Sequence, residues 1–480
     1  MVHRTAREAK REQAGNEIII KRDNKREGAA CDYATKVMKS SELSKILHGT
    51  FVGSDVELKH ISIDSRNVQN GDCFIAIKGD VFDGHDFISD VAKKGVAVAM
   101  VDRDVVADIP VIKVKNTRQA LMDLARFYRE SATIPVAAIT GSCGKTTTRA
   151  LLENITKQQG NVLASKKSFN NDIGLPLTLL QLNPSHDFVV LEIGTNHPGE
   201  IAQLTAIAKP TIATVTMVAP VHIEYFSSVD AIAHEKGAIF EGLTHDGIAV
   251  INADACYGDL WKKQSGDRLV MTFGYHQKAD VMAHDLQSTR DGKTIFTLVF
   301  GDKKTLISLP LLGEHNVTNA LAAATMAFAM DISIEHIQKG LETVQPEYGR
   351  LVEKKGMSGV LVIDDSYNAN PASVKAAIKF LTDRDANAIL VLGDMLELGD
   401  QANQLHADVG AFAKTCGLKQ LFCYGKHSLE TVKAFGKNAQ HFENHEALIN
   451  ELKSCLRKDT TVLIKGSRGM KMEKVVEALI

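Results

Sequence analysis

The sequence lacks a long uninterrupted hydrophobic run, an excess of either charge and any paired spacing among its cysteines. The longest apolar stretches, such as VAVAMV, suit buried strands and are too short to cross a membrane. A net charge of −2 argues against a nucleic acid or an anionic membrane as the main partner. Seven scattered cysteines, with no recognisable signal peptide before them, are typical of the reducing cytoplasm. We therefore expect a cytoplasmic protein without a membrane span or a nucleic-acid partner.

Sequence repeats and low-complexity tracts are also missing, although the chain has 480 residues. A chain of this length is too long to fold around one ordinary hydrophobic core, which indicates two to four domains. The content of 44% hydrophobic and 24% charged residues is that of a soluble globular protein. Changes in the pattern along the chain predict an extension over 1–37 and domains over 38–113, 114–344 and 345–480. No heptad pattern or large apolar surface signal is present, so we expect a monomer.

The first 37 residues have almost no apolar periodicity and mix basic with acidic side chains. Glu8, Glu12 and Glu17 argue against an organellar transit peptide, because such peptides are poor in acidic residues. We interpret this segment as a flexible extension, or as translation from a start site upstream of the true one. Met38 opens MKSSELSKILHG, which is typical of a first helix.

The remaining chain has the pattern of three successive α/β units. Residues 38–113 predict short strands broken by Asn-Gly, Gly-Asp and Asp-Gly turns, which indicates a small α/β module. From about residue 134, apolar strands alternate with helical segments. This pattern predicts a parallel, doubly wound, P-loop-type sheet whose polar strand ends share one ligand-binding edge. Residues 294–313 favour antiparallel hairpins added to this sheet. After about residue 344, a second alternating pattern predicts a Rossmann-like α/β domain.

The segment AITGSCGKTTT, residues 138–148, follows a predicted strand and opens a predicted helix. It lacks the first glycine of the common phosphate-binding loop, because Ile139 stands five residues before Gly144. In this context the backbone N–H groups and the helix start still favour a bound phosphate over an ordinary glycine-rich turn. Lys145 would then reach the β- and γ-phosphates, and the Thr146 hydroxyl would bind Mg²⁺. The predicted nucleotide-binding residues of the loop are Gly141, Ser142, Cys143, Gly144, Lys145, Thr146 and Thr147.

Two neighbouring strand ends carry residues that suit a magnesium site. Glu192 lies near the end of one predicted strand, and His222 and Glu224 follow the next. A carboxylate beside a phosphate loop is a natural ligand of Mg²⁺. Taken singly, His222 is better explained as a packed or surface histidine, and Lys236 in AIAHEKGAIF as a solvated helix lysine.

The phosphate loop resembles the short loop of the Mur ligase family, the ATP-dependent amide-forming enzymes of peptidoglycan precursor synthesis. Further segments resemble family motifs from Met38 onward, and the last three are characteristic of the member that adds D-alanyl-D-alanine. The segments are GEHNVTNALAA (313–323), PEYGR (346–350), DDSYNANP (364–371), LGDMLELG (392–399) and KGSRGMKMEKVV (465–476).

The resemblance implies a ligase that uses ATP, UDP-N-acetylmuramoyl-tripeptide and D-alanyl-D-alanine. The tripeptide carboxylate would become an acyl phosphate, and the dipeptide amine would then displace the phosphate. Diaminopimelate and lysine are both compatible as the third residue of the tripeptide. The nearest alternative is a family ligase with another acceptor, and DDSYNANP argues against it. A P-loop motor or regulatory GTPase lacks support, since no Asn-Lys-x-Asp occurs. An inactive binding module is disfavoured because the implied catalytic residues are intact: Lys145, Glu192, His222 and Lys236.

The resemblance also implies a role for each matching residue. Asn316 and Asn319 would lie near the adenine, and Arg350 and Asp365 would contact phosphate and ribose. Two Mg²⁺ ions would be held by Thr146, Glu192, His222 and Lys236, the lysine as a carbamate. The substrate-binding residues would be Ser65, Arg66, Asp83 and His85 for the UDP moiety, Asn170 and Asn171 for the sugar and pyrophosphate, and Asn368, Asn370 and Arg468 for the dipeptide.

Cys143 departs from the family, which often has asparagine or serine at this position. A helix start lowers the pKa of a thiol, so an oxidisable loop is one interpretation. The favoured interpretation is a tolerated small residue whose backbone binds phosphate. Because water would hydrolyse an acyl phosphate, we also expect the C-terminal domain to close over the central one before chemistry.

Overall fold

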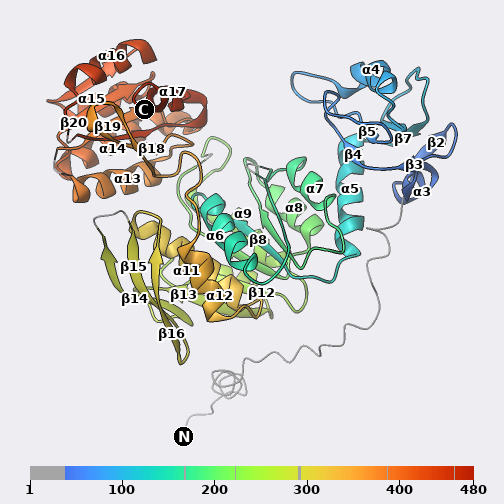
Figure 1. Ribbon diagram of the computed structural model, residues 1–480, viewed down its shortest axis with the longest axis horizontal. Helices are drawn as coiled ribbons and strands as arrows, with labels where there is room; N and C mark the ends of the chain where they lie inside the picture. Colours follow the sequence, from blue (N-terminus) through green and yellow to red (C-terminus); the bar gives the residue numbers. More distant parts are fainter. Residues whose placement is uncertain (1–37, 167–168, 222, 290–292, 386, 459) are drawn as a thin grey trace, which may run out of the picture.

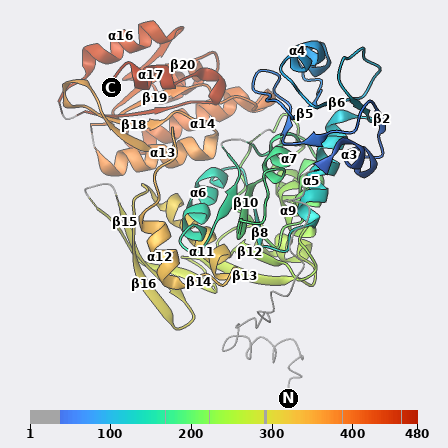
Figure 2. The same cartoon turned by 45° about the vertical axis from the view of Figure 1, so that its right-hand side comes forward.

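The computed structural model describes residues 38–166, 169–221, 223–289, 293–385, 387–458 and 460–480, which form three α/β modules. The N-terminal module carries strands β1–β7, the central module β8–β16 and the C-terminal module β17–β22. Figure 1 shows the N-terminal module in blue and the C-terminal module in orange and red at two different corners of the central module. The view in Figure 2 keeps this arrangement. The predicted three-part α/β fold is confirmed, whereas its boundaries at 113/114 and 344/345 stay predictions, and the extension over 1–37 lies outside the described residues.

The N-terminal module contains the sheet β2-β7-β6-β5-β4, in which β2 is antiparallel to β7 and the other neighbours are parallel. A separate antiparallel pair joins β1 to β3. Helix α5 buries Leu121 in the core of this module and Met122 in the core of the central module, so it connects the two modules. The elements are β1 Met38–Lys39, α3 Ser40–Ile46, β2 Thr50–Val52, β3 Glu57–Leu58, β4 Ile61–Ser62, β5 Cys73–Ile75, the 3₁₀ helix η1 Gly84–Phe87, α4 Ile88–Lys93, β6 Val98–Val101, β7 Val111–Lys113 and α5 Thr117–Glu130.

The central module contains a nine-stranded sheet in the order β16-β15-β14-β13-β12-β11-β8-β10-β9. Neighbouring strands from β9 to β14 are parallel. The pairs β14–β15 and β15–β16 are antiparallel, which confirms the predicted hairpins. The strands are β8 Val136–Thr140, β9 Val162–Ala164, β10 Phe188–Glu192, β11 Ile212–Val215, β12 Ile248–Asn252, β13 Leu269–Gly274, β14 Val281–Ser288, β15 Thr294–Phe300 and β16 Lys303–Leu309. The helices are α6 Lys145–Thr156, α7 Gly174–Leu179, α8 Glu200–Ala208, α9 Val229–Glu241, α10 Gly258–Gln264, α11 Glu314–Phe328 and α12 Ile334–Glu342.

Helices cover both faces of the central sheet, because its strands are apolar on both sides. Along β8, Ala137 and Ile139 belong to one core cluster, and Val136 and Ala138 belong to another. The first cluster includes residues of α6, α11 and α12, and the second includes residues of α5 and α7–α10. Since the parallel strands end at one edge, the loop at residues 141–144 lies at the carboxyl edge of the sheet.

The C-terminal module contains the sheet β17-β18-β22-β19-β20-β21, parallel except for the β17–β18 pair. One face packs against residues of α13, α14 and α15, and the other against residues of α16 and α17. This is the predicted Rossmann-like arrangement. Its elements are β17 Val352–Lys355, η2 Met357–Gly359, β18 Leu361–Asp365, α13 Pro371–Arg384, β19 Ile389–Gly393, η3 Gly399–Gln401, α14 Ala402–Thr415, β20 Gln420–Tyr424, α15 Ser428–Phe435, β21 Ala439–Phe442, α16 His445–Cys455, β22 Thr461–Lys465, η4 Arg468–Met470 and α17 Glu473–Glu477.

The helix predicted from Met38 begins at Ser40, two residues after the strand β1 opens. Searching the described segments for a helix with the length and apolar character of a membrane span finds none.

Candidate active site

The phosphate loop joins β8 to α6 and depends on two glycines. Gly141 has φ +150° and Gly144 has φ +85°, values that other residues rarely adopt. A Cβ on Gly141 would lie 1.9 Å from Thr216 Oγ1, and one on Gly144 would lie 2.4 Å from Asn319 Oδ1. The loop is therefore held tightly between β11 and α11, and only glycine fits at these two positions.

Lys145 is the first residue of α6 and bends back over the loop. Its Nζ donates a hydrogen bond of 2.7 Å to the carbonyl oxygen of Gly141. Burial lowers the pKa of Lys145, while the nearby Glu192 carboxylate acts in the opposite direction. The ammonium and the N-terminus of α6 thus place positive charge at one point, which suits a phosphate.

Thr146, Glu192 and Asn170 meet beside the loop. The Thr146 hydroxyl donates to Glu192 Oε2 at 2.9 Å, and Asn170 Nδ2 donates to Glu192 Oε1 at 2.8 Å. Glu192 is only 3% exposed, so its carboxylate is buried against these two donors. A hydroxyl and a carboxylate oxygen are the kinds of ligand that Mg²⁺ prefers. His222, the other predicted ligand on this side, lies outside the described residues. No group of three His, Cys, Asp or Glu side chains within the described ranges is arranged to hold a metal.

Lys236 lies on α9 and is 2% exposed, so it is not the solvated helix lysine that its local sequence favours. Burial, and secondly the charge of Lys145, lower the pKa of Lys236 to about 7. Among the described residues, no hydrogen bond or ion pair engages its Nζ. A buried amine with this pKa is partly neutral near pH 7, and a neutral amine is the form that can react with CO₂.

Asn316 and Asn319 lie on the first turns of α11, where they connect that helix to α6. Asn316 Nδ2 donates to the carbonyl oxygen of Leu312 at 2.7 Å. Asn319 Nδ2 donates to Asn316 Oδ1 at 3.0 Å, and Thr148 Oγ1 donates to Asn319 Oδ1 at 3.3 Å. Both asparagines are buried, and their side chains are fixed by this chain of hydrogen bonds.

A cavity of about 330 Å³ lies between the phosphate loop, α11 and the C-terminal module. It brings together three residues of the loop segment, the two asparagines, Arg350 and Asp365. The Arg350 guanidinium lies 4.4 Å from the centroid of the Tyr367 ring. The lining residues are Cys143, Gly144, Thr147, Thr216, Met217, Asn252, His315, Asn316, Thr318, Asn319, Arg350, Leu351, Asp365, Ala372, Ser373, Ala376, Ala377 and Lys465. Residues predicted for ATP thus meet here from three distant parts of the chain, whereas Gly141, Ser142, Lys145 and Thr146 are not among the lining residues.

Thr216, His315 and Lys465 are among the residues of this cavity that sequence reasoning missed. Thr216, the residue after β11, donates to the Cys143 carbonyl oxygen, and His315 lies beside Asn316 on α11. Lys465, the last residue of β22, is 1% exposed and forms a 2.6 Å ion pair with Asp365. The signal was available for Lys465, because it is a charged residue at the end of an apolar strand and opens the motif KGSRG.

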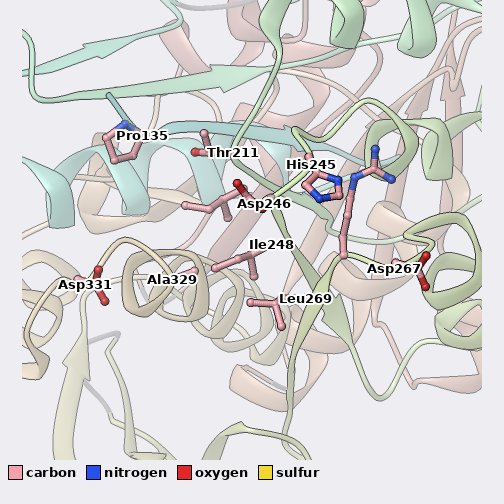
Figure 3. A pocket seen from close by; sticks show the side chains of 12 residues that line it. Pro135, Thr211, His245, Asp246, Ile248, Asp267, Leu269, Ala329 and Asp331 are labelled. Atoms are coloured by element: carbon pink, nitrogen blue, oxygen red, sulfur yellow. The ribbon is translucent and has the colours of Figure 1, made fainter. Parts of the chain in front are cut away.

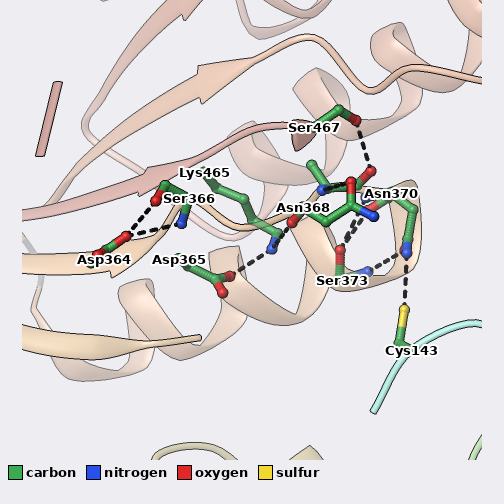
Figure 4. Close-up of polar contacts among 10 residues, drawn as sticks. Cys143, Asp364, Asp365, Ser366, Asn368, Asn370, Ser373, Lys465 and Ser467 are labelled. Carbon is green, nitrogen blue, oxygen red and sulfur yellow. Dashed lines mark hydrogen bonds and ion pairs between the residues drawn. The ribbon is translucent and has the colours of Figure 1, made fainter. Parts of the chain in front are cut away.

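The segment from Ser366 to Asn370 follows β18 and approaches the phosphate loop (Figure 4). Asn370 caps α13 through a reciprocal hydrogen-bonded pair with Ser373, and its Nδ2 also donates to Cys143 Sγ at 2.9 Å. Asn368 Oδ1 accepts a hydrogen bond from the Ala369 N–H. Arg468 is exposed and forms a 3.2 Å ion pair with Glu473. Of the three residues predicted for the dipeptide, Asn370 is the one that contacts the phosphate loop.

The residues predicted for the UDP moiety lie in the N-terminal module. The exposed Arg66 pairs with Asp64 at 2.8 Å. Asp83 accepts a 2.6 Å hydrogen bond from His85 Nδ1 and a 2.7 Å hydrogen bond from Arg103. The carbonyl oxygen of Ser65 accepts from Lys94 at 2.8 Å. Desolvation raises the pKa of Asp83, but the hydrogen bonds from His85 and Arg103 outweigh it and lower this pKa to about 2.

A groove of about 940 Å³ lies between the N-terminal module and α7 of the central module. Asp64 lines it, together with Phe169, but Ser65, Arg66, Asp83 and His85 are not among its lining residues. Asn171 lies just before α7, and its Oδ1 accepts a hydrogen bond from the Gly174 N–H at 2.8 Å. The groove is lined by Met38, Glu57, Leu58, Lys59, His60, Ile61, Ser62, Ile63, Asp64, Tyr128, Phe169, Leu177, Leu180, Gln181, Leu182 and Asn183.

A different cavity, of about 670 Å³, lies at the opposite edge of the central sheet, where β8, β11, β12 and β13 begin (Figure 3). Arg268 lines this cavity. Its guanidinium group donates hydrogen bonds to the backbone carbonyl oxygens of Glu241, Leu243, Thr244 and Ser265. These contacts make Arg268 a structural residue rather than an anion ligand. Open α/β sheets bind ligands at the carboxyl edge, which favours the cavity beside the phosphate loop.

Comparison with protein families gives three matches along the chain. The Mur ligase family catalytic domain matches residues 57–129, the Mur ligase middle domain residues 139–327, and the Mur ligase glutamate ligase domain residues 349–468.

Two curated relatives carry the same name, UDP-N-acetylmuramoyl-tripeptide–D-alanyl-D-alanine ligase. The protein of Escherichia coli K12 is 38% identical over 444 residues, which are 92% of this chain and 97% of the relative. The protein of Bacillus subtilis 168 is 33% identical over 452 residues, 91% of this chain and 97% of the relative.

Solved structures give the same likeness. A crystal structure of MurF from Acinetobacter baumannii superposes with a TM-score of 0.88 at 32% identity, over 92% of this chain and 98% of the other. MurF ligase from Thermotoga maritima in complex with ADP has a TM-score of 0.79 at 26% identity, over 88% and 96% of the two chains.

Proposed function

The chain belongs to the Mur ligase family, and we propose that it joins D-alanyl-D-alanine to UDP-N-acetylmuramoyl-tripeptide at the expense of ATP. The product would be the UDP-N-acetylmuramoyl-pentapeptide precursor of peptidoglycan, with ADP and phosphate. The observation that carries this proposal is the end-to-end match with ligases of this name. The cavity that joins the phosphate loop to Arg350 and Asp365 supplies a place for the nucleotide. We place the reaction in the cytoplasm and expect a monomer.

In the proposed reaction, the C-terminal carboxylate of the tripeptide attacks the γ-phosphate of ATP, and ADP leaves. The amine of the dipeptide then attacks the acyl phosphate carbon, an amide bond forms, and phosphate leaves. The first step brings two anions together, so the site must offset their repulsion. Lys145 and the N–H groups of the loop from Gly141 to Gly144 supply positive charge where the phosphates would lie.

The residues present fit a magnesium site. The Thr146 hydroxyl and the Glu192 carboxylate are 2.9 Å apart at the edge of the loop, and both are oxygen donors. Lys236 fits a carbamate, because it is buried, has a pKa of about 7 and could become an anionic oxygen donor. Two Mg²⁺ ions held by Thr146, Glu192, His222 and carbamylated Lys236 would neutralise charge on the phosphates.

For the substrates, we propose that the UDP moiety occupies the groove beside Asp64, near Ser65 and Arg66. Asp83 and His85 would support the neighbouring loops. Asn170 would connect this end of the substrate to Glu192, to which it is already hydrogen-bonded, and Asn171 would hold α7 in place. The dipeptide would bind next to Asn368, Asn370 and Arg468.

The acceptor tests this assignment against the other ligases of the family. The protein would be incubated with ATP, Mg²⁺ and UDP-N-acetylmuramoyl-tripeptide. The acceptor would be D-alanyl-D-alanine in one reaction and a single amino acid, glutamate included, in each of the others. We expect a product with the mass of the pentapeptide only when D-alanyl-D-alanine is the acceptor. The tripeptide that gives this product ends in diaminopimelate or in lysine, or both tripeptides give it. A product with a single amino acid in place of the dipeptide would overturn the assignment.

A further inference from the structure

Lys465 and Asp365 form a buried ion pair at the carboxyl edge of the C-terminal sheet. They lie opposite each other in the parallel register of β18 and β22. Lys465 Nζ is 2.6 Å from Asp365 Oδ2, and the two side chains are 2% and 9% exposed. The same Nζ donates to the carbonyl oxygen of Asn368 at 2.9 Å (Figure 4). One buried lysine therefore fixes both a carboxylate and the loop that follows it.

Both members of the pair line the cavity that the phosphate loop shares with the C-terminal module. The lysine engages Oδ2 of Asp365, and no described residue donates a hydrogen bond to Oδ1. A carboxylate with one oxygen fixed has its second oxygen oriented as a hydrogen-bond acceptor. The lysine also balances the charge of Asp365, which would otherwise repel a polyphosphate bound near by.

The neighbouring residue of β18 supplies a natural comparison. Asp364 is 0% exposed and pairs with Lys354 Nζ at 2.8 Å. Because successive side chains of a strand point to opposite faces, this second pair lies on the other side of the sheet. Neither Lys354 nor Asp364 lines the cavity. The lysine–aspartate pair at 2.6 Å thus lines the cavity, and the neighbouring pair at 2.8 Å does not.

Residues at the end of β22 also form hydrogen bonds to the segment from Asn368 to Asn370, which reaches the phosphate loop. Lys465 binds the Asn368 carbonyl oxygen, and Ser467 Oγ donates to the Ala369 carbonyl oxygen at 3.1 Å. The next residue is Asn370, whose Nδ2 contacts Cys143 Sγ. The position of Asn370 therefore depends on Lys465 and Ser467, which are not among the residues predicted to bind the nucleotide.

We propose that Lys465 is a positioning residue for the nucleotide. It holds the Asp365 carboxylate so that Oδ1 accepts a hydrogen bond from a ribose hydroxyl, and it holds the loop that presents Asn370 to the phosphate end. The inference deepens the proposed function, on which it rests for the identity of the nucleotide.

The test measures binding of ADP, 2′-deoxy-ADP and 3′-deoxy-ADP by calorimetry, since these nucleotides cannot drive ligation. The full chain is compared with Lys465→Met, Lys465→Arg and the matched control Lys354→Met, each first checked for folding by thermal melting. We expect the unaltered chain to bind at least one deoxy form about 10-fold more weakly than ADP, the scale of one charge-assisted hydrogen bond. Both Lys465 variants should bind all three nucleotides with similar, weakened affinity. Lys354→Met should keep the preference for ribose even where its melting temperature falls.

The proposal would be overturned if a folded Lys465 variant still preferred ADP to the deoxy forms. It would also be overturned if the unaltered chain showed no such preference. If both Lys465 variants fail to fold while Lys354→Met folds, Lys465 is a folding residue and the proposal is also wrong. The result of this binding experiment is independent of the result of the test for pentapeptide formation. A ribose preference that depends on Lys465, without pentapeptide formation, would refute the ligase and leave the positioning role.

Discussion

Asn370 of the C-terminal module donates a hydrogen bond from Nδ2 to Cys143 Sγ of the phosphate loop, over a distance of 2.9 Å. The same asparagine begins α13 through its pairing with Ser373. The start of a helix in one module is thereby placed against the nucleotide loop of another. A movement of the C-terminal module would therefore change the surroundings of the phosphate loop at this contact.

Cys143 itself should contribute little to catalysis. We expect Cys143→Ala to change kcat by less than about fivefold, because loss of one hydrogen bond to sulfur amounts to about 1 kcal/mol. Steady-state phosphate release would measure this, with Cys416→Ala as a thiol control away from the loop. A collapse of activity in Cys143→Ala, but not in the control, would instead support a functional thiol.

Closure of the C-terminal module should accompany binding of ATP and substrates, because the acyl phosphate must be shielded from water. Small-angle scattering would follow the radius of gyration of the free chain and of the chain with ATP, Mg²⁺ and UDP-N-acetylmuramoyl-tripeptide. We expect a decrease on binding. An unchanged radius of gyration would count against closure.

Lys145→Ala should lower kcat by about 10²–10³, the usual effect of removing one preorganised charge donor from an active site. The ammonium lies over the loop and contacts Gly141, so its loss removes charge without removing a core side chain. The control is Lys157→Ala, a lysine just after α6 whose ion pair with Glu153 lies on the surface. Equal activity of the two variants would contradict the role of Lys145.

Lys236→Met should abolish activity and stabilise the fold. The folded-state pKa of about 7 lies below the ordinary value of 10.5, so the buried ammonium is destabilising. This destabilisation is fully present below pH 7 and fades as the pH rises towards 10.5. In CO₂-free buffer at pH 7 we expect the melting temperature to rise by about 4 °C or more, with a smaller rise at pH 9. Lys263→Met, on the surface of α10, should change neither activity nor melting temperature. A fall in the melting temperature of Lys236→Met at pH 7 would contradict the unpaired ammonium.

Carbamylation gives Lys236 a second test, since CO₂ adds to the neutral amine. We expect activity in CO₂-free buffer to be restored by bicarbonate, more fully at pH 8 than at pH 6, because the neutral fraction rises through a pKa of about 7. Activity that is independent of bicarbonate at both pH values would refute the carbamate.

His406 should make the protein sensitive to acid. Its Nδ1–H donates to the Ala402 carbonyl oxygen at 2.7 Å, and Nε2 accepts from the Met395 N–H at 3.0 Å, so the buried ring is neutral. Burial lowers its pKa, although Asp394 acts in the opposite direction. The unfolded chain therefore takes up the proton first. The contribution of His406 to stability should be constant above pH 7 and should be lost as the pH decreases from 6.5 towards the folded-state pKa.

Urea unfolding at pH 7.5 and pH 5.5 would test this for the unaltered chain, His406→Gln and the surface control His245→Gln. The difference in unfolding free energy between the two pH values should shrink in His406→Gln alone. An unchanged difference in that variant would show that other groups cause the acid sensitivity.

The strands, the phosphate loop and the order of the modules could be predicted because each is a local property. Apolar runs that end in polar residues predict a parallel sheet, and Gly141 and Gly144 mark a backbone that needs left-handed or otherwise unusual dihedrals. The role of Lys236 could not be predicted locally, because its burial depends on how α9 packs against the central sheet. The place of Lys465 at the end of an apolar strand could be read from the sequence, but its ion pair could not, since its partner Asp365 lies 100 residues away. The surroundings of Asp83 and His85 likewise depend on Arg103 and Asp102, which come from a later part of the N-terminal module.

The most direct test of the account measures phosphate release from ATP and Mg²⁺ while each of the other two substrates is supplied or withheld. The account predicts sustained release only when UDP-N-acetylmuramoyl-tripeptide and D-alanyl-D-alanine are both present, with one pentapeptide formed for each phosphate. Sustained release with ATP alone would identify a nucleotide hydrolase and contradict the ligase.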